Sequence, residues 1–513
     1  MNSRLPLTSL DGRRFDVVII GGGINGAAGA QQLAARGFQV LLADKGDFGS
    51  GSSSRSSRLL HCGLRYLAPG GSAWDFLLHP SRLATGMRMA RLAIEARHEF
   101  VNTTAARAQL SKLYFPIYKG GAYSGWQVDL AFRMLDHYNR GRIPLNYQRL
   151  SGPRAASIPL VNALRDFDTL DSVASYDEFQ ISWPERVTVD IALDARRMGA
   201  TVLNYTEAEL VGRRGDGWEV ALHDAIDGTR VRVQAEAVVN TAGIWIDKVL
   251  GPHRAGKPPK VLGTKGSHIA VELAPECRGI GVATINRKNE PFYCLPWGRY
   301  HYIGPTELIY EGDLDKIRTS TQDRDWLLAE ANHLFPSFNL TARDVAHTWS
   351  GVRPLTWDAR LPKGNRSRVL HDLSVDGLDK VFAMTGGPVM THRSAGVEIA
   401  DAVAARVRRT GKATVADFRS DFPSPQEADV LPALRGDRPP PPWLDAMLEH
   451  GMVVHLSDAL MRRAGVPWYH PLQDTDIERI GRYLGGRLGW APARTEQEIA
   501  AFKQELSVLQ HAV

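Results

Sequence analysis

The stretch VVIIGGGINGAAGA, residues 17–30, decides the fold of this chain. It extends FDVVII, residues 15–20, a short β-branched run that ends in glycines, as a buried parallel strand does. Residues 24–36 are rich in alanine and favour a helix, Gly37 provides a C-terminal stop, and FQVLLAD, residues 38–44, predicts a second strand. The N-terminal segment therefore predicts a strand, a helix and a parallel strand, the start of a Rossmann-like α/β fold.

The glycines between the first strand and the helix match the pattern G-x-G-x-x-G, as Gly21, Gly23 and Gly26. They allow a tight turn and let backbone N–H groups approach a pyrophosphate at the positive end of the helix. Asp44 ends the second strand, where a carboxylate can accept hydrogen bonds from an adenosine ribose. A turn without a ligand is the simpler alternative, but strand, helix and acid in register favour a dinucleotide. The motif alone leaves NAD and FAD open.

Length and composition indicate a folded protein of two or three domains, because 513 residues exceed the size at which one core keeps growing. Three cysteines, Cys62, Cys277 and Cys294, lie too far apart for a disulfide framework or a metal-ligand spacing, so we expect a reducing compartment and no metal site. The N-terminus lacks the apolar core of a signal peptide, and no apolar run reaches the roughly 18 residues of a spanning helix. These features predict a cytoplasmic protein.

The chain carries a net charge of +6, from 62 Lys and Arg against 56 Asp and Glu. A solvated surface with surplus arginine is the simplest interpretation. The functional interpretations are that the positive charge binds a nucleic acid, an anionic membrane surface or a small anionic substrate. No basic run with interleaved aromatic residues supports a nucleic acid, so we expect none and keep the other two.

Beyond the first unit, helical patterns at about 80–98, 124–139 and 185–198 alternate with short strands. Later strands show β-type alternation and aromatic enrichment, which favours an antiparallel substrate sheet. The run of four prolines at 439–442 predicts an extended connector, and the patterns after it predict a small helical domain. We expect its helices at about 443–463, 473–488 and 495–510.

The stretch GSGSSSRSSRLLHCGLRYLAPG, residues 49–70, resembles the flavin-contacting loop of the FAD-dependent glycerol-3-phosphate dehydrogenase family, of the aerobic, quinone-linked type. The resemblance continues over nearly the whole chain, through VVNTAGIWID (238–247), KGSHIAVEL (265–273), WSGVRPL (349–355), VFAMTGGPVMTHRSAGVEIADAV (381–403) and HLSDALMRRAG (455–465).

The resemblance implies a Rossmann-like FAD domain, an interleaved antiparallel-sheet substrate domain of the glucose-oxidoreductase or D-amino-acid-oxidase type, and a small C-terminal helical domain. The expected segments are 1–80, 155–250 and 365–412 for the FAD domain, 81–154 and 251–364 for the substrate domain, 413–442 for a linker and 443–513 for the helical domain.

FAD is the cofactor that the resemblance implies, and hydroxyls with backbone N–H groups suit its ribityl diphosphate. A solvent-facing capping loop is the alternative for the serine run, although the apolar LRYL that follows suits a pocket wall. The implied FAD-binding residues are Gly21, Gly23, Asn25, Gly26, Asp44, Ser53, Ser54, Ser56, Ser57, His61, Gly63, Leu64, Gly243, Gly386, Gly387 and Thr391.

The substrate site implied by the resemblance contains Arg65, Tyr66, His268, Arg353 and Thr391. Arg65 and Arg353 would hold an anionic group, and His268 would act as the base, since a neutral imidazole has a suitable pKa. Arg65, His268 and Arg353 are therefore the implied catalytic residues. From the residues alone, the preferred reading of His268 is a core histidine. For Arg353 a structural ion-pair residue is the alternative, although an arginine in the centre of a flavin enzyme needs an anion.

The implied reaction oxidises a secondary alcohol of a small anionic polyol to the ketone by hydride transfer to the flavin. Glycerol 3-phosphate or a related phosphorylated polyol is the expected substrate, and a quinone or another acceptor takes the electrons. The family binds the membrane surface without spanning it, so this protein could lie on the inner face of the membrane, and it could form a homodimer.

Three positions depart from the family pattern: Cys62 replaces a glycine, Pro388 replaces a lysine that contacts substrate, and His371 falls near a family arginine. A phosphate pocket with one cation fewer binds a dianion less well, since charge-assisted hydrogen bonds contribute about 1.5–3 kcal/mol each. Two alternatives therefore stay open. One is a related flavin oxidase or dehydrogenase for another anionic hydroxy or amino compound, and the other is a flavoprotein retained only for binding.

Overall fold

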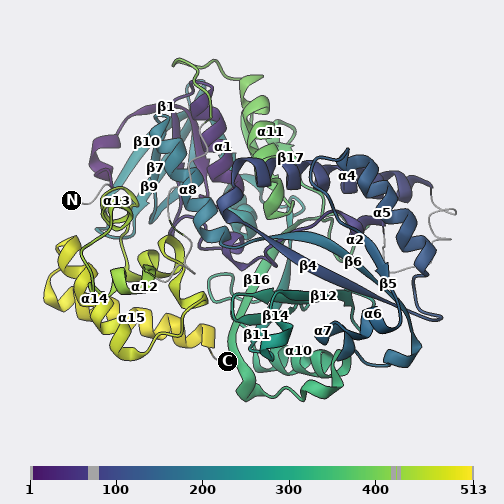
Figure 1. Ribbon diagram of the computed structural model, residues 1–513. Coiled ribbons are helices and arrows are strands. Elements are labelled where there is room, and N and C mark those ends of the chain that lie inside the picture. The colour runs from purple at the N-terminus through teal and green to yellow at the C-terminus, as the bar shows by residue number, and fades with distance from the viewer. Residues whose placement is uncertain (1–3, 68–79, 417–422, 424–428, 511–513) are drawn as a thin grey trace.

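The computed structural model describes residues 4–67, 80–416, 423 and 429–510 (Figure 1). Two β-sheets form its framework. The first sheet has the strand order β17-β18-β10-β1-β2-β7, extended by β9 and β8 at β10. Its strands are β1 (Arg14–Ile20), β2 (Val40–Ala43), β7 (Thr201–Leu203), β8 (Thr206–Arg214), β9 (Gly217–Asp224), β10 (Arg230–Asn240), β17 (Val369–Asp372) and β18 (Val381–Thr385).

The centre of this sheet is parallel, because β18, β10, β1, β2 and β7 all run in one direction. Val17 and Ile19 of β1 pack into one apolar cluster, and Val18 and Ile20 pack into another on the opposite face. The strand is covered on both faces, which explains its unbroken apolar sequence. The Rossmann-like fold predicted from this stretch is confirmed.

Three helices cover one face of the first sheet: α1 (Ile24–Ala35), α8 (Pro184–Arg197) and α11 (His392–Ala404). Helix α1 lies between the other two and packs against both. It starts at the residue predicted from the alanine-rich pattern, directly after the glycine turn. The turn therefore sits at the carboxyl edge of the parallel strands, where ligands bind in this class of fold.

The second sheet has the order β15-β11-β14-β13-β12-β4-β6-β3, with β16 beside β11 and β5 beside β6. All its pairs are antiparallel except β4 with β12. Its strands are β3 (Leu59–Leu60), β4 (Ala108–Tyr118), β5 (Gln148–Leu150), β6 (Leu170–Ile181), β11 (Val261–Val271), β12 (Ile280–Ile285), β13 (Pro291–Trp297), β14 (Tyr300–Gly304), β15 (Leu308–Ile309) and β16 (Val345–Thr356). The antiparallel substrate sheet is thus present, with one parallel pair.

Strand β6 (Leu170–Ile181) differs from the expected division of the chain, which placed 155–250 in the FAD domain. It pairs with β4 along its whole length and belongs to the second sheet. The reason is its pairing: after β1 and β2, the chain returns to the first sheet only after β6, through α8 and β7. Helices α4 (Pro80–Thr103) and α5 (Gly125–Asn139) pack on one face of the second sheet, and α10 (Thr321–Leu334) packs on the other.

The C-terminal region is helical, as predicted, with α13 (Pro442–His450), α14 (Asp474–Leu488) and α15 (Pro492–Gln510). The pattern predicted as one helix over 443–463 is instead α13 followed by a separate π-helical segment, η12 (Asp458–Arg463). Gly451 caps α13, and Met452 has φ +52°, so the helix cannot continue. The expected extended linker also contains one short helix, α12 (Val430–Leu434).

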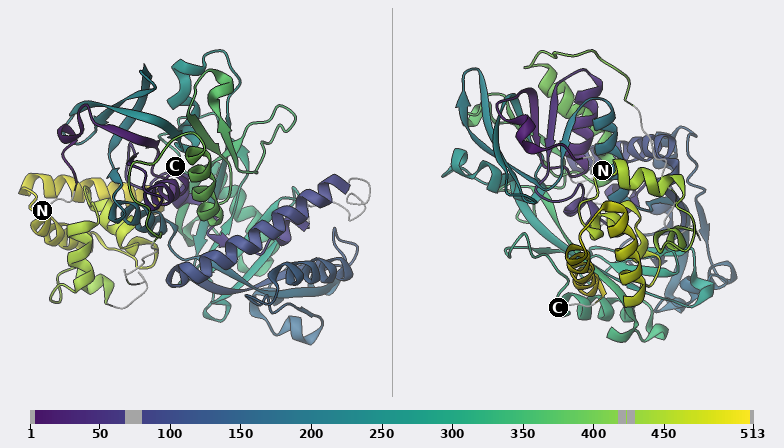
Figure 2. Two further views of the ribbon diagram at one scale, coloured as in Figure 1. Left: turned by 90° about the horizontal axis from the view of Figure 1, so that it is seen from above. Right: turned by 90° about the vertical axis from the view of Figure 1, so that its left-hand side faces the viewer.

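The C-terminal helices lie beside both sheets, where they appear in yellow (Figures 1 and 2). Helix α15 packs against β16 of the second sheet, and η12 packs against α8 of the first. None of the described helices has the length and apolar character needed to cross a membrane.

Candidate active site

A large cavity of about 1630 Å³ lies at the carboxyl edge of the parallel strands and extends to the second sheet. Its lining includes the first residue after each of four parallel strands: Gly21 after β1, Asp44 after β2, Gly386 after β18 and Thr241 after β10. Of the predicted site residues, those that line it are Gly21, Gly23, Asn25, Asp44, Ser53, Ser56, Ser57, His61, Tyr66, Gly243, Arg353, Gly386 and Gly387.

The glycine turn leaves no room for side chains. Gly21 has φ +104°, and a Cβ atom on Gly26 would stand 1.9 Å from the Gly21 carbonyl oxygen. Helix α1 begins at Ile24, whose N–H donates to the Ser53 hydroxyl at 3.0 Å. The backbone can therefore approach a ligand closely at the helix N-terminus, where the helix dipole favours an anion.

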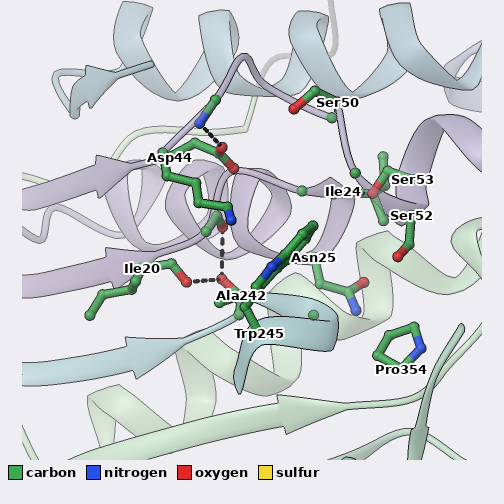
Figure 3. Close-up of a pocket in the computed structure, with 18 of the residues that line it drawn as sticks. Ile20, Ile24, Asn25, Asp44, Ser50, Ser52, Ser53, Ala242, Trp245 and Pro354 are labelled. Carbon is green, nitrogen blue, oxygen red and sulfur yellow. Dashed lines mark hydrogen bonds between the residues drawn. The ribbon is translucent and has the colours of Figure 1, made fainter. Parts of the chain in front are cut away.

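Asp44 lies directly beside the same turn (Figure 3). Its carboxylate accepts the N–H of Gly22 at 2.6 Å and the N–H of Gly46 at 2.8 Å. Burial raises the pKa of this carboxyl group, and the two backbone hydrogen bonds oppose that rise. Asp44 thus fixes the turn and the loop after β2 while facing the cavity.

The serine-rich stretch forms a short 3-10 helix, η2 (Ser52–Arg55). The Ser52 hydroxyl donates to the carbonyl of Val352 at 2.7 Å and so ties the loop to the second sheet. Ser54 donates to the Gly51 carbonyl within its own loop at 3.0 Å and does not line the cavity. Ser56 and Ser57 do line it.

The glycine turn, the carboxylate of Asp44 and the serine hydroxyls form one continuous wall. An unobstructed helix N-terminus suits a diphosphate, a carboxylate suits ribose hydroxyls, and serine hydroxyls suit a ribityl chain. The residues present fit FAD.

Arg353 projects from β16 into the wall formed by the second sheet. Strands β16 and β11 place Gly351 opposite Gly266, and Arg353 opposite Thr264. A Cβ atom on Gly266 would lie 2.4–2.7 Å from Nη2, Cζ and Nη1 of the Arg353 guanidinium group. Glycine at 266 therefore makes the flat surface on which the guanidinium rests.

His268 lies two residues beyond Gly266 on β11 and is only 1% exposed. Its ring stacks on Trp349 with centroids 4.8 Å apart, and it does not line the cavity. Burial lowers its pKa well below the usual value, and the charges of Arg353 and Arg58 lower it further. The imidazole is held neutral behind the cavity wall.

Other predicted residues also lie away from the cavity. Thr391 donates its hydroxyl to the Pro388 carbonyl at 2.9 Å, and the side chain of Arg65 is outside the described part of the chain. The predicted residues that do not line the cavity are Gly26, Ser54, Gly63, Leu64, His268 and Thr391.

The three departures from the family pattern occupy different surroundings. Cys62 is buried, its N–H donates to Glu178 at 2.8 Å, and it does not line the cavity, so it does not crowd a ligand there. His371 contacts the Thr385 hydroxyl at 2.9 Å and also lies outside the lining. Pro388 lines the cavity next to Gly387.

Several cavity residues were missed at the level of sequence: Lys45, Arg55, Arg58 and Trp245. The Lys45 ammonium lies over the Trp245 ring, 4.2 Å from its centroid. Arg55 and Arg58, which stand within the serine-rich stretch, were the signal that the sequence offered. If this stretch forms a pocket wall, its arginine side chains are expected to face the pocket.

Comparison with known proteins gives one consistent result. Residues 16–404 match the family model described as FAD dependent oxidoreductase. A glycerol-3-phosphate dehydrogenase of Synechocystis sp. is 32% identical over 412 residues, which are 77% of this chain and 71% of that protein.

Among the solved structures that share the fold are two with glycerol phosphate in their names. The glycerol-3-phosphate dehydrogenase of Bacillus halodurans complexed with FAD has a TM-score of 0.71 at 21% identity and covers 98% of this chain and 97% of its own. The L-alpha-glycerophosphate oxidase of Mycoplasma pneumoniae has a TM-score of 0.58 at 17% identity and covers 80% of this chain and 99% of its own. The chain therefore belongs to the FAD-dependent oxidoreductase family and is a glycerol-3-phosphate dehydrogenase-like, FAD-dependent enzyme.

Proposed function

We propose that this enzyme oxidises sn-glycerol 3-phosphate, or a closely related phosphorylated polyol, to the corresponding ketone. The observation that carries the proposal is the guanidinium group of Arg353, which rests on Gly266 in the cavity wall. A planar, permanently charged group in that place suits bidentate binding of a phosphate. The name of the Synechocystis relative supports the same substrate.

FAD would be held by the glycine turn, by Asp44 and by the serine loop, and when bound it supplies the two-electron acceptor. His61 and Tyr66 line the cavity beyond the serines, and their rings meet edge to face at 5.4 Å. We assign Tyr66, with Arg65 beside it in sequence, to the substrate end of the cavity, because they follow the cofactor loop directly.

The chain's own residues then perform two tasks. Arg353 holds the anionic group and so orients the carbinol carbon, which converts binding energy into alignment. We assign proton removal from the hydroxyl to His268, because its imidazole is neutral and so has a ring nitrogen without a proton; the lowered pKa also makes this ring a weaker base than an ordinary histidine. The ring lies behind the wall, so this role requires that substrate binding opens contact between the ring and the cavity.

Pro388 favours a second candidate, a flavin oxidase or dehydrogenase for another anionic hydroxy or amino compound. It lines the cavity and has no side-chain donor. A phosphate dianion gains more binding energy from an additional cation than a carboxylate does. A proline at position 388, in place of a cation, therefore favours a substrate with less negative charge.

For the electron acceptor we propose a quinone at a membrane surface. Trp126 and Leu130 lie one turn apart on α5 and are 64% and 51% exposed, and Arg133, three residues after Leu130 on the same helix, is exposed as well. Aromatic and aliphatic side chains beside arginines suit the interface of an anionic bilayer.

Anaerobic addition of sn-glycerol 3-phosphate to the purified protein tests the function. Bleaching of the flavin absorbance is expected for the proposed substrate. If dithionite bleaches the flavin and glycerol 3-phosphate does not, the proposal is wrong, and hydroxy acids and amino acids are the next compounds to assay.

A further inference from the structure

The loop that carries the cavity serines is bound to the C-terminal helical region through Asp47, which lies at the N-terminal end of the loop. This carboxylate is completely buried and accepts hydrogen bonds from both Nη atoms of Arg463, with Nη2 at 2.8 Å, and from Nε of Arg462 at 2.5 Å. Burial opposes ionisation of Asp47, but the charges of Arg463 and Arg462 hold its pKa far below the usual range. The contact is therefore a buried, charged and bidentate clamp.

The same loop is tied at its other end by Arg58. Its guanidinium donates to Glu185 at 2.9 Å and lies over two indole rings, 4.3 Å from the centroid of Trp297 and 5.4 Å from that of Trp468. Trp468 belongs to the C-terminal region and is buried. Cations desolvated against aromatic faces are held strongly.

The C-terminal clamp is itself anchored to the first sheet. Asp458, in the same π-helical turn as Arg462 and Arg463, accepts a hydrogen bond from Arg462 at 2.5 Å and from the hydroxyl of Tyr205 at 2.6 Å. Tyr205 follows β7 closely. The arginines are thus fixed relative to the parallel strands, and the loop is fixed relative to the arginines.

Between Asp47 and Arg58 stand the serines that line the cavity, and Asp44 comes just before them. A small rotation of this loop would move the serine hydroxyls away from the glycine turn. The family model ends at residue 404, so residues 462–468 lie outside the matched flavin-binding segment.

We propose that residues 462–468 position the serine loop for FAD, with Arg463 acting through Asp47 and Trp468 acting through Arg58. These are positioning residues, because the cavity lining does not include them. The inference rests on the FAD dependence of the family and is independent of which substrate is oxidised.

The test measures the dissociation constant of FAD with deflavinated full-length protein, together with the melting temperature of the apoprotein. Arg463→Lys keeps the charge but loses the planar fork, and Trp468→Phe keeps the apolar packing but weakens the contact with Arg58. We expect each to raise the dissociation constant roughly 10- to 100-fold, as loss of orienting contacts does, whatever its effect on the melting temperature of the apoprotein.

Arg435→Lys is the matched control, since Arg435 pairs with Asp476 within the C-terminal region at 2.6 Å. It should change the dissociation constant less than twofold. The proposal is overturned if Arg463→Lys and Trp468→Phe bind FAD as tightly as the wild type. It is overturned equally if the melting temperature falls while the dissociation constant stays constant, because the contacts then serve only folding.

Discussion

The guanidinium group of Arg353 occupies the place where a side chain on Gly266 would stand, with its Nη2 atom 2.4 Å from the position of a Cβ atom there. Gly266→Ala should therefore displace Arg353 without altering the residues that face FAD. We expect a KM for substrate about tenfold higher, because a misplaced binding group costs alignment. Steady-state kinetics of the FAD-loaded variant check this. Gly212→Ala in β8, where a Cβ atom meets nothing within 4 Å, is the control.

Arg353 itself can be tested by comparing two replacements. Arg353→Lys keeps the charge and loses the fork, whereas Arg353→Ala loses both. If Arg353 binds a phosphate, KM should rise in that order, by roughly 10-fold and then 100-fold or more, at unchanged flavin content. Equal activity of all three proteins, with FAD bound, would remove Arg353 from the site.

Gly26→Ala is expected to prevent FAD binding. Its Cβ atom would stand 1.9 Å from the Gly21 carbonyl oxygen and 2.5 Å from the Thr241 hydroxyl oxygen, so the turn would have to open. The variant should purify without yellow colour and fail to take up added FAD, as followed by flavin absorbance. A fully loaded yellow variant would show that this turn does not hold the cofactor.

The region around these residues shows what could be predicted from sequence and what could not. The glycine turn, its helix and the place of Asp44 at the end of the second strand were predicted correctly, because strand, turn and helix are local and each glycine has a steric reason. From the residues alone His268 reads as a core histidine, and it is buried; its stacking on Trp349, which lies on another strand, was not predictable.

The same limit applies to Arg58 and Asp47. Nothing near Asp47 in sequence marks it as buried, because the two arginines that neutralise it are more than 400 residues away. The family resemblance could place the serine loop, but the contacts that hold it come from segments brought together only by the tertiary fold.

Pro388 offers a gain-of-function test of the substrate. Its φ of −76° and ψ of 150° suit any residue, so Pro388→Lys should fold normally. A lysine there would add a cation at the cavity, and we expect the KM for a phosphorylated polyol to fall about tenfold or more. An unchanged KM for glycerol 3-phosphate, with an intact wild-type preference for another substrate, would favour the second candidate function.

Glu178 predicts a pH dependence of stability. It is buried, its Oε2 atom accepts the Cys62 N–H at 2.8 Å, and its Oε1 atom lies 3.5 Å from Nε of Arg97. Burial raises its pKa to about 7, although Arg97 opposes the rise. Between pH 4.5 and 7 the folded protein therefore holds a proton that the unfolded chain has released. The contribution of Glu178 to the free energy of unfolding falls as the pH rises through this window, by roughly 3 kcal/mol in all.

Glu178→Gln removes this titration and keeps the size of the side chain, so its stability should fall less than that of the wild type between pH 5 and pH 8. Urea unfolding of the FAD-saturated proteins at both pH values measures the difference. Glu311→Gln, at an exposed position, should keep the wild-type pH dependence. If Glu178→Gln and the wild type lose stability equally over this range, the carboxyl group of Glu178 titrates alike in the folded and unfolded states, and Arg97 compensates its burial completely.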